Sequence, residues 1–245
     1  MGLFDLFRKK EPDDFEMRGR LVELVKKHLT ERGNRIRAEN AICAAASIVG
    51  ERCIEAAGDY PLREHDIPPG RRVFSDRANQ LLCGDAAESE IANLPSQSIY
   101  GILKAELNDE AYPVKCFPTL VSVFSGFAAG VGKTEDWGKV PVTVLPRYHP
   151  TISPLQFAFE TREKVDAILG PVAGDKQRCL RISTKALASL LNQMTKAIEP
   201  DVALRLAFEI INGMAKTAPM TAKAMAAMRS APSVAISSFK FSPKR

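Results

Sequence analysis

Apolar residues recur every three or four positions along most of this chain, which is the spacing that places them on one face of an α-helix. The first strong segment begins at Asp13 and is stopped by Gly33, and the second runs from about residue 35 to a stop at Gly58. Their connection is short, so we predict that the two helices form an antiparallel hairpin that hides both apolar stripes.

Six further segments carry helix signals, and most of them lie in the second half of the chain. They cover residues 76–83, the segment that follows residue 96, residues 155–169, residues 180–198, the segment opened by Pro200 and residues 220–228. Ser75 is a favourable N-cap and Gly84 a stop signal for the first of these helices, and Pro200 suits a first helical turn. The later segments predict a helical cluster at the C-terminal end.

The segment from about residue 109 to 150 departs from this pattern. β-branched and aromatic residues occur there together with prolines and glycines, which predicts short strands at residues 114–117, 120–124 and 140–145. The nearby prolines argue that these strands are sheet edges or extended segments. The predicted fold class is therefore mainly α, with an N-terminal helical hairpin and a C-terminal helical cluster separated by a short extended or β insertion.

The composition is that of a globular protein large enough to bury its own core. The 245 residues are 45% hydrophobic and 26% charged, as in ordinary globular domains. We therefore divide the chain into an amphipathic N-terminal segment (1–12), one helix-rich domain (13–230) that contains the insertion (109–150), and a loose basic tail (231–245).

The charges argue against one class of protein, the nucleic-acid binders, and the cysteines indicate a reducing compartment. Lysine and arginine total 34 and aspartate and glutamate 29, and both signs are scattered along the chain, which argues against nucleic-acid binding. The five cysteines form no CxxC pair, so we expect reduced thiols and a cytoplasmic location. We expect neither a membrane-spanning helix nor a secretory leader, because no apolar run is long enough.

One segment partly matches a phosphate-binding loop. Gly130, Gly132, Lys133 and Thr134 fit the end of the G-x-x-x-x-G-K-[ST] pattern, in which backbone amides and a lysine bind phosphate oxygens. Phe127 stands where the first glycine is required, and the residues that follow are a poor start for a helix. The four residues form a weak nucleotide-site hypothesis, a glycine-rich turn is the favoured interpretation, and we predict no cofactor.

A second candidate is the polar loop at residues 59–76. Its candidate actors are His65, Asp66, Arg71, Arg72 and Asp76. Carboxylates beside a histidine can orient it for acid–base chemistry, but a metal site needs three or four convergent ligands, so we expect no metal. A solvated surface loop is the favoured interpretation, and an enzyme that uses these five side chains is the alternative.

The N-terminal segment gives the clearest signal for a non-enzymatic role. Four apolar residues are followed there by three basic ones, namely Leu3, Phe4, Leu6, Phe7, Arg8, Lys9 and Lys10. Such a turn can dock on its own domain, on a partner protein or on an anionic membrane surface. Burial of the four apolar side chains, at about 2 kcal/mol each, makes such a contact favourable.

The chain carries no complete signature for a nucleophile, a metal or a nucleotide. We therefore predict a non-enzymatic interaction or scaffold protein, a component of a larger assembly with a protein partner, located in the cytoplasm or at the periphery of a membrane. The alternatives are an enzyme with its site in the polar loop 59–76, and a nucleic-acid or anionic-membrane binder that uses the basic termini. The sequence indicates neither a small-molecule ligand nor an oligomeric state.

Overall fold

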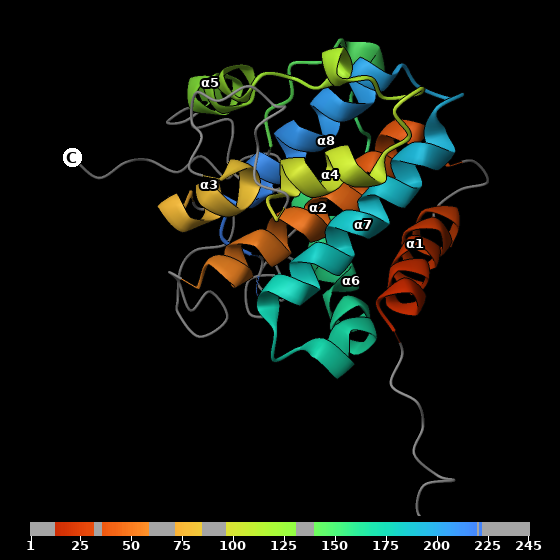
Figure 1. Cartoon of the computed structure of the whole chain (residues 1–245), viewed down its shortest axis with the longest axis vertical. Helices are drawn as coiled ribbons and strands as arrows, with labels where there is room; N and C mark the ends of the chain where they lie inside the picture. Colours follow the sequence, from red (N-terminus) through yellow and green to blue (C-terminus); the bar gives the residue numbers. More distant parts are fainter. Residues whose placement is uncertain are drawn as a thin grey trace, which may run out of the picture.

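The structure of this chain is a computed structural model that describes residues 13–31, 36–58, 72–84, 97–130, 140–219 and 221. Its α-helices are α1 (Asp14–Glu31), α2 (Ala38–Ala57), α3 (Asp76–Cys83), α4 (Ile99–Glu106), α5 (Leu120–Gly130), α6 (Pro154–Leu169), α7 (Lys176–Met194) and α8 (Pro200–Met214) (Figure 1). Its short 3-10 helices are η3 (Val114–Cys116), η5 (Pro146–Tyr148) and η6 (Gly170–Val172). The predicted mainly α class is confirmed for these ranges.

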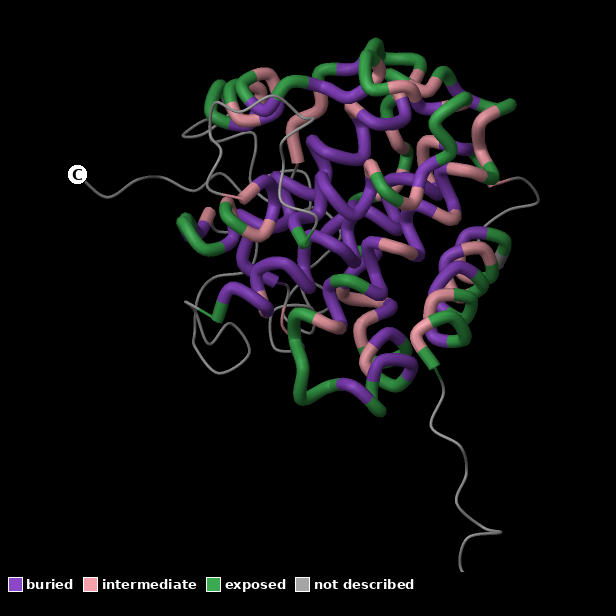
Figure 2. The backbone as a smooth tube through the Cα atoms, viewed as in Figure 1, coloured by how far each residue is buried: buried purple, intermediate pink, exposed green. Residues whose placement is uncertain are grey.

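Helix α2 lies at the centre of the molecule, and 17 of its 20 residues are buried. Figure 2 shows this helix as buried backbone along almost its whole length. Its sequence is rich in alanine, so neighbouring helices can approach it from several sides, and a helix that is apolar around most of its circumference is expected to be buried. Helices α7 and α8 make most of the contacts with α2, and α1, α3 and α6 cover the remaining surface.

Helices α2 and α8 approach each other closely at Gly50. A Cβ atom placed on Gly50 would lie 2.4 Å from the Cβ of Met214 and 2.8 Å from the carbonyl oxygen of Ile211. Both of these atoms belong to, or are attached directly to, the α8 backbone, so neither can swing away as the end of a long side chain can. The absence of a side chain at Gly50 therefore sets the distance between the two helices.

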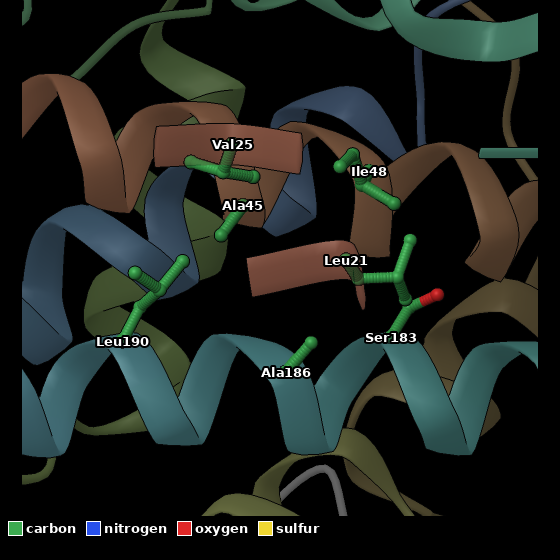
Figure 3. A pocket seen from close by; sticks show the side chains of 7 residues that line it. All are labelled: Leu21, Val25, Ala45, Ile48, Ser183, Ala186 and Leu190. Atoms are coloured by element: carbon green, nitrogen blue, oxygen red, sulfur yellow. The ribbon is translucent and has the colours of Figure 1, made fainter. Parts of the chain in front are cut away.

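One continuous hydrophobic cluster draws residues from all eight of the α-helices described. Helix α1 contacts α2, as their short connection predicts, but it makes more of its contacts with α7. Between α1, α2 and α7 lies a void of about 10 Å³ (Figure 3), lined by Leu21, Val25, Ala45, Ile48, Ser183, Ala186 and Leu190. A void of this size holds one water molecule at most, so the core is closely packed there.

The prediction of strands in the insertion is wrong where the structure describes it. Residues 114–116 form η3 and residues 120–124 open helix α5, while residues 140–145 lie outside any strand. Within the described part of the chain, β pairing is limited to one isolated bridge between Arg72 and Thr217.

The reason is that helical spacing of the apolar residues outweighs their β propensity. Leu120, Val123 and Phe127 are buried at positions i, i+3 and i+7, whereas Val121 points to solvent. The hydroxyl of Thr119 accepts the N–H of Ser122 at 3.2 Å and so stabilises the first turn of α5. β propensity is weak where packing favours another conformation, and here packing against α8 favours a helix.

Local end signals located several other helices correctly. Helix α3 spans the predicted residues, and its N-cap Ser75 accepts the N–H of Ala78 at 2.9 Å. Gly58 ends α2 with a φ of 72°, which glycine adopts without strain. Helix α7 begins four residues before the predicted position 180, because Asp175 caps it by accepting the N–H of Arg178 at 2.9 Å.

Two further expectations concern the ends of the chain and its place relative to a membrane. The predicted helix at 220–228 falls almost wholly outside the described residues, and the proposed boundaries at 12 and 230 stay predictions. Among the helices described, none is both long enough and apolar enough to cross a bilayer.

Candidate functional site: the polar cluster between α5 and α8

The residues singled out from the sequence fall mostly outside the described ranges. His65, Asp66 and Arg71 belong to the undescribed segment 59–71, so an active site in that loop stays a prediction. Asp76 is the first residue of α3 and is exposed, and Arg72 is half-buried beside Thr217.

The residues of the nucleotide-site hypothesis and of the N-terminal docking segment also lie almost wholly outside the described ranges. Gly130 is the last residue of α5, whereas Gly132, Lys133 and Thr134 lie in the undescribed segment 131–139. The N-terminal docking residues, Leu3, Phe4, Leu6, Phe7, Arg8, Lys9 and Lys10, also lie outside the described ranges. Both therefore stay predictions.

The described surface offers little for a metal ion or a large ligand. No group of three or more potential metal-binding side chains occurs among the described residues. A surface hollow of about 190 Å³ lies between α3, α4 and α7 and is lined by Leu81, Gln97, Ile102, Gln177, Leu180 and Arg181. Ligand sites usually measure about 300 Å³ or more, so this hollow is small for one. The more informative chemistry lies in polar side chains buried between helices.

Such a row of polar side chains runs along α8 and continues past its end. Glu209, Asn212 and Lys216 are all buried and are spaced three and four residues apart, so they follow one face. Their contacts are with helix α5 and with Thr143, which lies between α5 and η5. Because buried polar groups cost free energy unless they find partners, each of the three has a defined set of contacts.

Glu209 connects the segment around residue 143 to α8 through two hydrogen bonds. Its carboxylate accepts the backbone N–H of Thr143 at 2.7 Å and also the hydroxyl of the same residue. The guanidinium of Arg205, one turn earlier on α8, lies 3.8 Å from the carboxylate. Thr143 in turn packs against α5, since its methyl carbon would lie 3.2 Å from a Cβ at Gly126.

Asn212 connects α5 with Lys216. Its side-chain N–H donates to the carbonyl oxygen of Val123 in α5, at 3.4 Å. Its side-chain oxygen accepts a hydrogen bond from the amine of Lys216 at 2.6 Å. A fully buried amide thus uses its donor on one helix and its acceptor on the buried lysine.

Lys216 is the most unusual member of the cluster, because it is only 6% exposed and forms no ion pair with any described residue. Its Nζ lies 4.3 Å from the ring centroid of Phe124 and 5.3 Å from that of Phe127. Ring faces attract a cation, but they replace only part of the hydration that the ammonium loses. Burial accordingly lowers the pKa of Lys216 to about 8, although the nearby thiols of Cys83 and Cys53 act in the opposite direction.

Arg72 borders the same cluster. Its guanidinium carbon lies 4.8 Å from the ring centroid of Phe127, and it donates a hydrogen bond to the hydroxyl of Thr217 at 2.7 Å. The backbone joins the two segments as well, since the N–H of Val73 donates to the carbonyl oxygen of Lys216 at 2.9 Å. Two cationic side chains are therefore held in contact with one aromatic ring.

A second buried polar group lies between α2 and α6, and its contacts are those of a structural tie. It consists of Glu51, Arg52, Glu55, Arg162 and Asp166. Arg52 lies 2.8 Å from Glu55 and 2.9 Å from Asp166, and Arg162 pairs with Glu51. Burial raises the pKa of Glu51, and the two arginines partly oppose this effect. Each charge has an opposite charge beside it, so the group joins the two helices.

Replacement of Lys216 by methionine should stabilise the protein near neutral pH. The lowered pKa corresponds to a cost of about 3 kcal/mol for keeping the ammonium buried. In the variant the side-chain oxygen of Asn212 would lose its hydrogen bond, which should cost about 1 kcal/mol. We therefore expect a gain of about 2 kcal/mol in the free energy of unfolding at pH 7.

The gain should depend on pH, because the native pKa of Lys216 is about 8 while its ordinary value is 10.5. The native chain binds fewer protons than the unfolded chain between these values, so the wild-type protein becomes more stable as the pH rises from 8 to 10.5. The advantage of Lys216→Met should be full below pH 8 and should shrink above it. Urea unfolding at pH 7 and pH 9.5 measures it, and an equal gain at both values would contradict the buried-ammonium account. Lys185→Met, which removes a half-exposed lysine paired with Glu106, is the control.

Comparison with known protein families, with curated proteins and with solved structures finds no match for this chain. The assignment of the α5–α8 cluster therefore rests on its own contacts. The sequence does contain one signal for it, because Glu209, Asn212 and Lys216 interrupt an otherwise apolar stretch at helical spacing. The sequence does not show, however, that these three side chains lie against α5.

Proposed function

We propose that this protein acts by binding another protein and that helix α5 is a docking element. The supporting observation is that none of the eleven residues of α5 is charged, yet one side of the helix faces solvent. Val121 is 68% exposed, and Ser125, Ala128 and Ala129 are exposed on the same helix. A solvent-exposed helix normally carries charged side chains on its outer face, so this one has the composition of a helix that is covered.

The attachment of α5 supports the same proposal. Among the helices described, α8 is the one with which α5 makes substantial contact, and α5 lies at the edge of the molecule (Figure 1). Part of that contact is polar, through Asn212 and Lys216. Among the described residues, five large apolar side chains are at least half exposed, and three of them, Val114, Val121 and Leu145, lie in this part of the sequence.

The composition of the exposed face also indicates the kind of partner. Small side chains allow a close approach of two backbones, and none of the side chains on this face carries a charge. A short helix of this kind fits an apolar groove on another protein, with the exposed valine as its main anchor. The face is small beside the roughly 800 Å² that each partner contributes to a stable interface, so we expect a reversible contact. In an assembly, the N-terminal residues 3–10 would supply a second contact.

The test introduces a charge on the α5 face. We expect Val121→Asp combined with Ala128→Asp to weaken partner binding at least tenfold, because a carboxylate would be buried unpaired in an apolar groove. The control is Phe15→Asp, which places one such carboxylate on another exposed apolar position, in α1, at 80% exposure. Both variants alter exposed residues, so circular dichroism should show an unchanged helix content.

Native mass spectrometry of gently purified full-length protein, followed by cross-linking, provides the measurement. A protein-sized adduct that is lost in the α5 variant and kept in Phe15→Asp supports the proposal, and a cross-link to α5 would place it. An adduct that survives the α5 substitutions, or added mass of nucleotide or metabolite size only, contradicts it. The second result would favour the enzyme alternative.

A further inference from the structure

The hollow between α3, α4 and α7 has the features of a docking site for apolar side chains. Its volume of about 190 Å³ is small for a ligand but suits one or two large side chains. Its lining combines three apolar residues with three polar ones, namely Leu81, Ile102, Leu180, Gln97, Gln177 and Arg181. The apolar residues are buried or half-buried and the polar ones are exposed, so an apolar pocket lies within a polar rim. Protein interfaces hold their anchor side chains in pockets of this kind.

The polar side chains at the rim are available to an incoming segment of chain. The amides of Gln97 and Gln177 have no hydrogen-bond partner within the ranges that the structure describes. The guanidinium of Arg181 lies 3.9 Å from the carboxylate of Asp14, which is beyond hydrogen-bond distance, and that carboxylate pairs with Arg178 at 2.7 Å. Amides can bond the backbone of a docked segment, and a guanidinium can lie over an aromatic ring.

We propose that this hollow binds the apolar side chains of an N-terminal segment of the same chain, namely Leu3, Phe4, Leu6 and Phe7. The occupant is indicated by the position of Asp14, since α1 packs beside α7 (Figure 1) and begins next to Arg181 at the rim. The point from which residues 1–12 extend therefore lies beside the hollow. The chain from Phe7 to Asp13 spans up to about 20 Å when extended, which is more than the one arginine side chain that separates Asp14 from the hollow.

The short connection favours this occupant over a separate molecule. Residues 8–12 form a link of a length that gives the preceding side chains an effective concentration at the hollow in the millimolar range. A contact with a Kd of about 1 mM is then occupied within one chain at least about half of the time. A free partner at micromolar concentration would fill the same site in only about 0.1% of the molecules.

The charges along this route are compatible with the proposal. The link begins with the basic residues Arg8, Lys9 and Lys10. Exposed carboxylates lie at both of its ends, since Asp13 is the point of attachment and Asp175, the N-cap of α7, is two residues from Gln177 in the hollow. The basic side chains can therefore pair with carboxylates while the apolar ones enter the hollow.

This docking does not rest on the role proposed for α5, because the hollow is formed by other helices. It does change what residues 3–10 can do in an assembly. A partner protein can bind them only by displacing their apolar side chains from the hollow, so the hollow is an intramolecular competitor for that contact.

Disulfide trapping in the full chain tests the docking. Asp5→Cys places a thiol among the four apolar residues without replacing any of them, and Gln177→Cys places a second thiol at the rim. The control combines Asp5→Cys with Glu23→Cys, an exposed position on α1 that the same link can reach. The protein is oxidised with glutathione disulfide at low micromolar concentration, and peptide mass spectrometry follows each disulfide. We expect the disulfide between positions 5 and 177 to form at least tenfold faster than that between positions 5 and 23.

A further variant isolates the apolar side chains. Phe4→Ser with Phe7→Ser, added to the pair at positions 5 and 177, should slow disulfide formation at least fivefold. A rate at position 177 no higher than at position 23 would overturn the docking, and so would disulfides formed mainly between two molecules, which would make a second copy the occupant. An advantage of position 177 that survives the loss of both phenylalanines would overturn their role as anchors. These measurements use no partner protein, so their failure is distinct from a failure of the α5 proposal.

Discussion

Replacement of Arg162 by methionine should lower the free energy of unfolding by about 3–4 kcal/mol at pH 7. The guanidinium of Arg162 pairs with Glu51, whose side chain is only 4% exposed. Removal of one member of a buried ion pair leaves the other charge without its partner in a poorly solvated place, which is among the most costly single changes in a protein. Arg52 is adjacent in sequence but is already engaged with Glu55 and Asp166.

The loss should become smaller in acid. Burial already raises the pKa of Glu51, and Arg162 lowers it, so the variant should raise that pKa further. A carboxyl with a raised native pKa adds stability at low pH, where it is protonated, and loses that contribution as the pH rises through the native pKa. Urea unfolding at pH 7 and pH 5 measures the difference. The control is Arg178→Met, which breaks a half-exposed pair with Asp14 and should cost less than about 1 kcal/mol. Similar losses in the two variants would show that burial of the network carries no extra energy.

Alanine in place of Gly50 should cost about 3 kcal/mol through steric strain. Its Cβ would meet the Cβ of Met214 at 2.4 Å and the carbonyl oxygen of Ile211 at 2.8 Å, and both distances are shorter than van der Waals contact. Because those atoms are fixed to the α8 backbone, α2 and α8 would have to separate, and both would lose part of their buried contacts.

The control for this substitution is Gly19→Ala in α1. Gly19 is exposed, and a Cβ there would have no atom within 4 Å, so the same change should stabilise the helix by up to about 1 kcal/mol. Thermal unfolding of the two variants should therefore shift in opposite directions. A Gly50→Ala protein that melts within a degree of the wild type would mean that the two helices adjust without cost.

The helices that the sequence located correctly are those whose ends carry short-range signals. Ser75 and Gly84 bracket α3, Gly58 ends α2 and Pro200 opens α8, and each acts on neighbouring backbone atoms. Helix α5 is less evident from the sequence, because its β-branched residues taken singly favour a strand. Its buried apolar residues at positions 120, 123 and 127 nevertheless follow the helical period.

The candidate site could not be predicted from the sequence, for a different reason. Lys216 and Glu51 belong to residue types that are usually exposed, and their burial results from helices far apart along the chain. Lys216 meets α5 about ninety residues away, and Glu51 meets Arg162 across more than a hundred. Only the spacing of Glu209, Asn212 and Lys216 could have been noticed beforehand, and it does not identify what lies opposite.

The central position of α2 also has a consequence for how the chain is made. This helix is synthesised before α7 and α8, the two helices that contribute most to its cover. Until residue 214 is available, a largely apolar helix lacks most of its final neighbours, and exposed apolar surface of this kind promotes aggregation. Nascent chains that stop before α8 should therefore depend on chaperones, and synthesis from the N-terminus onward delays the completion of the core until nearly all of the described chain exists.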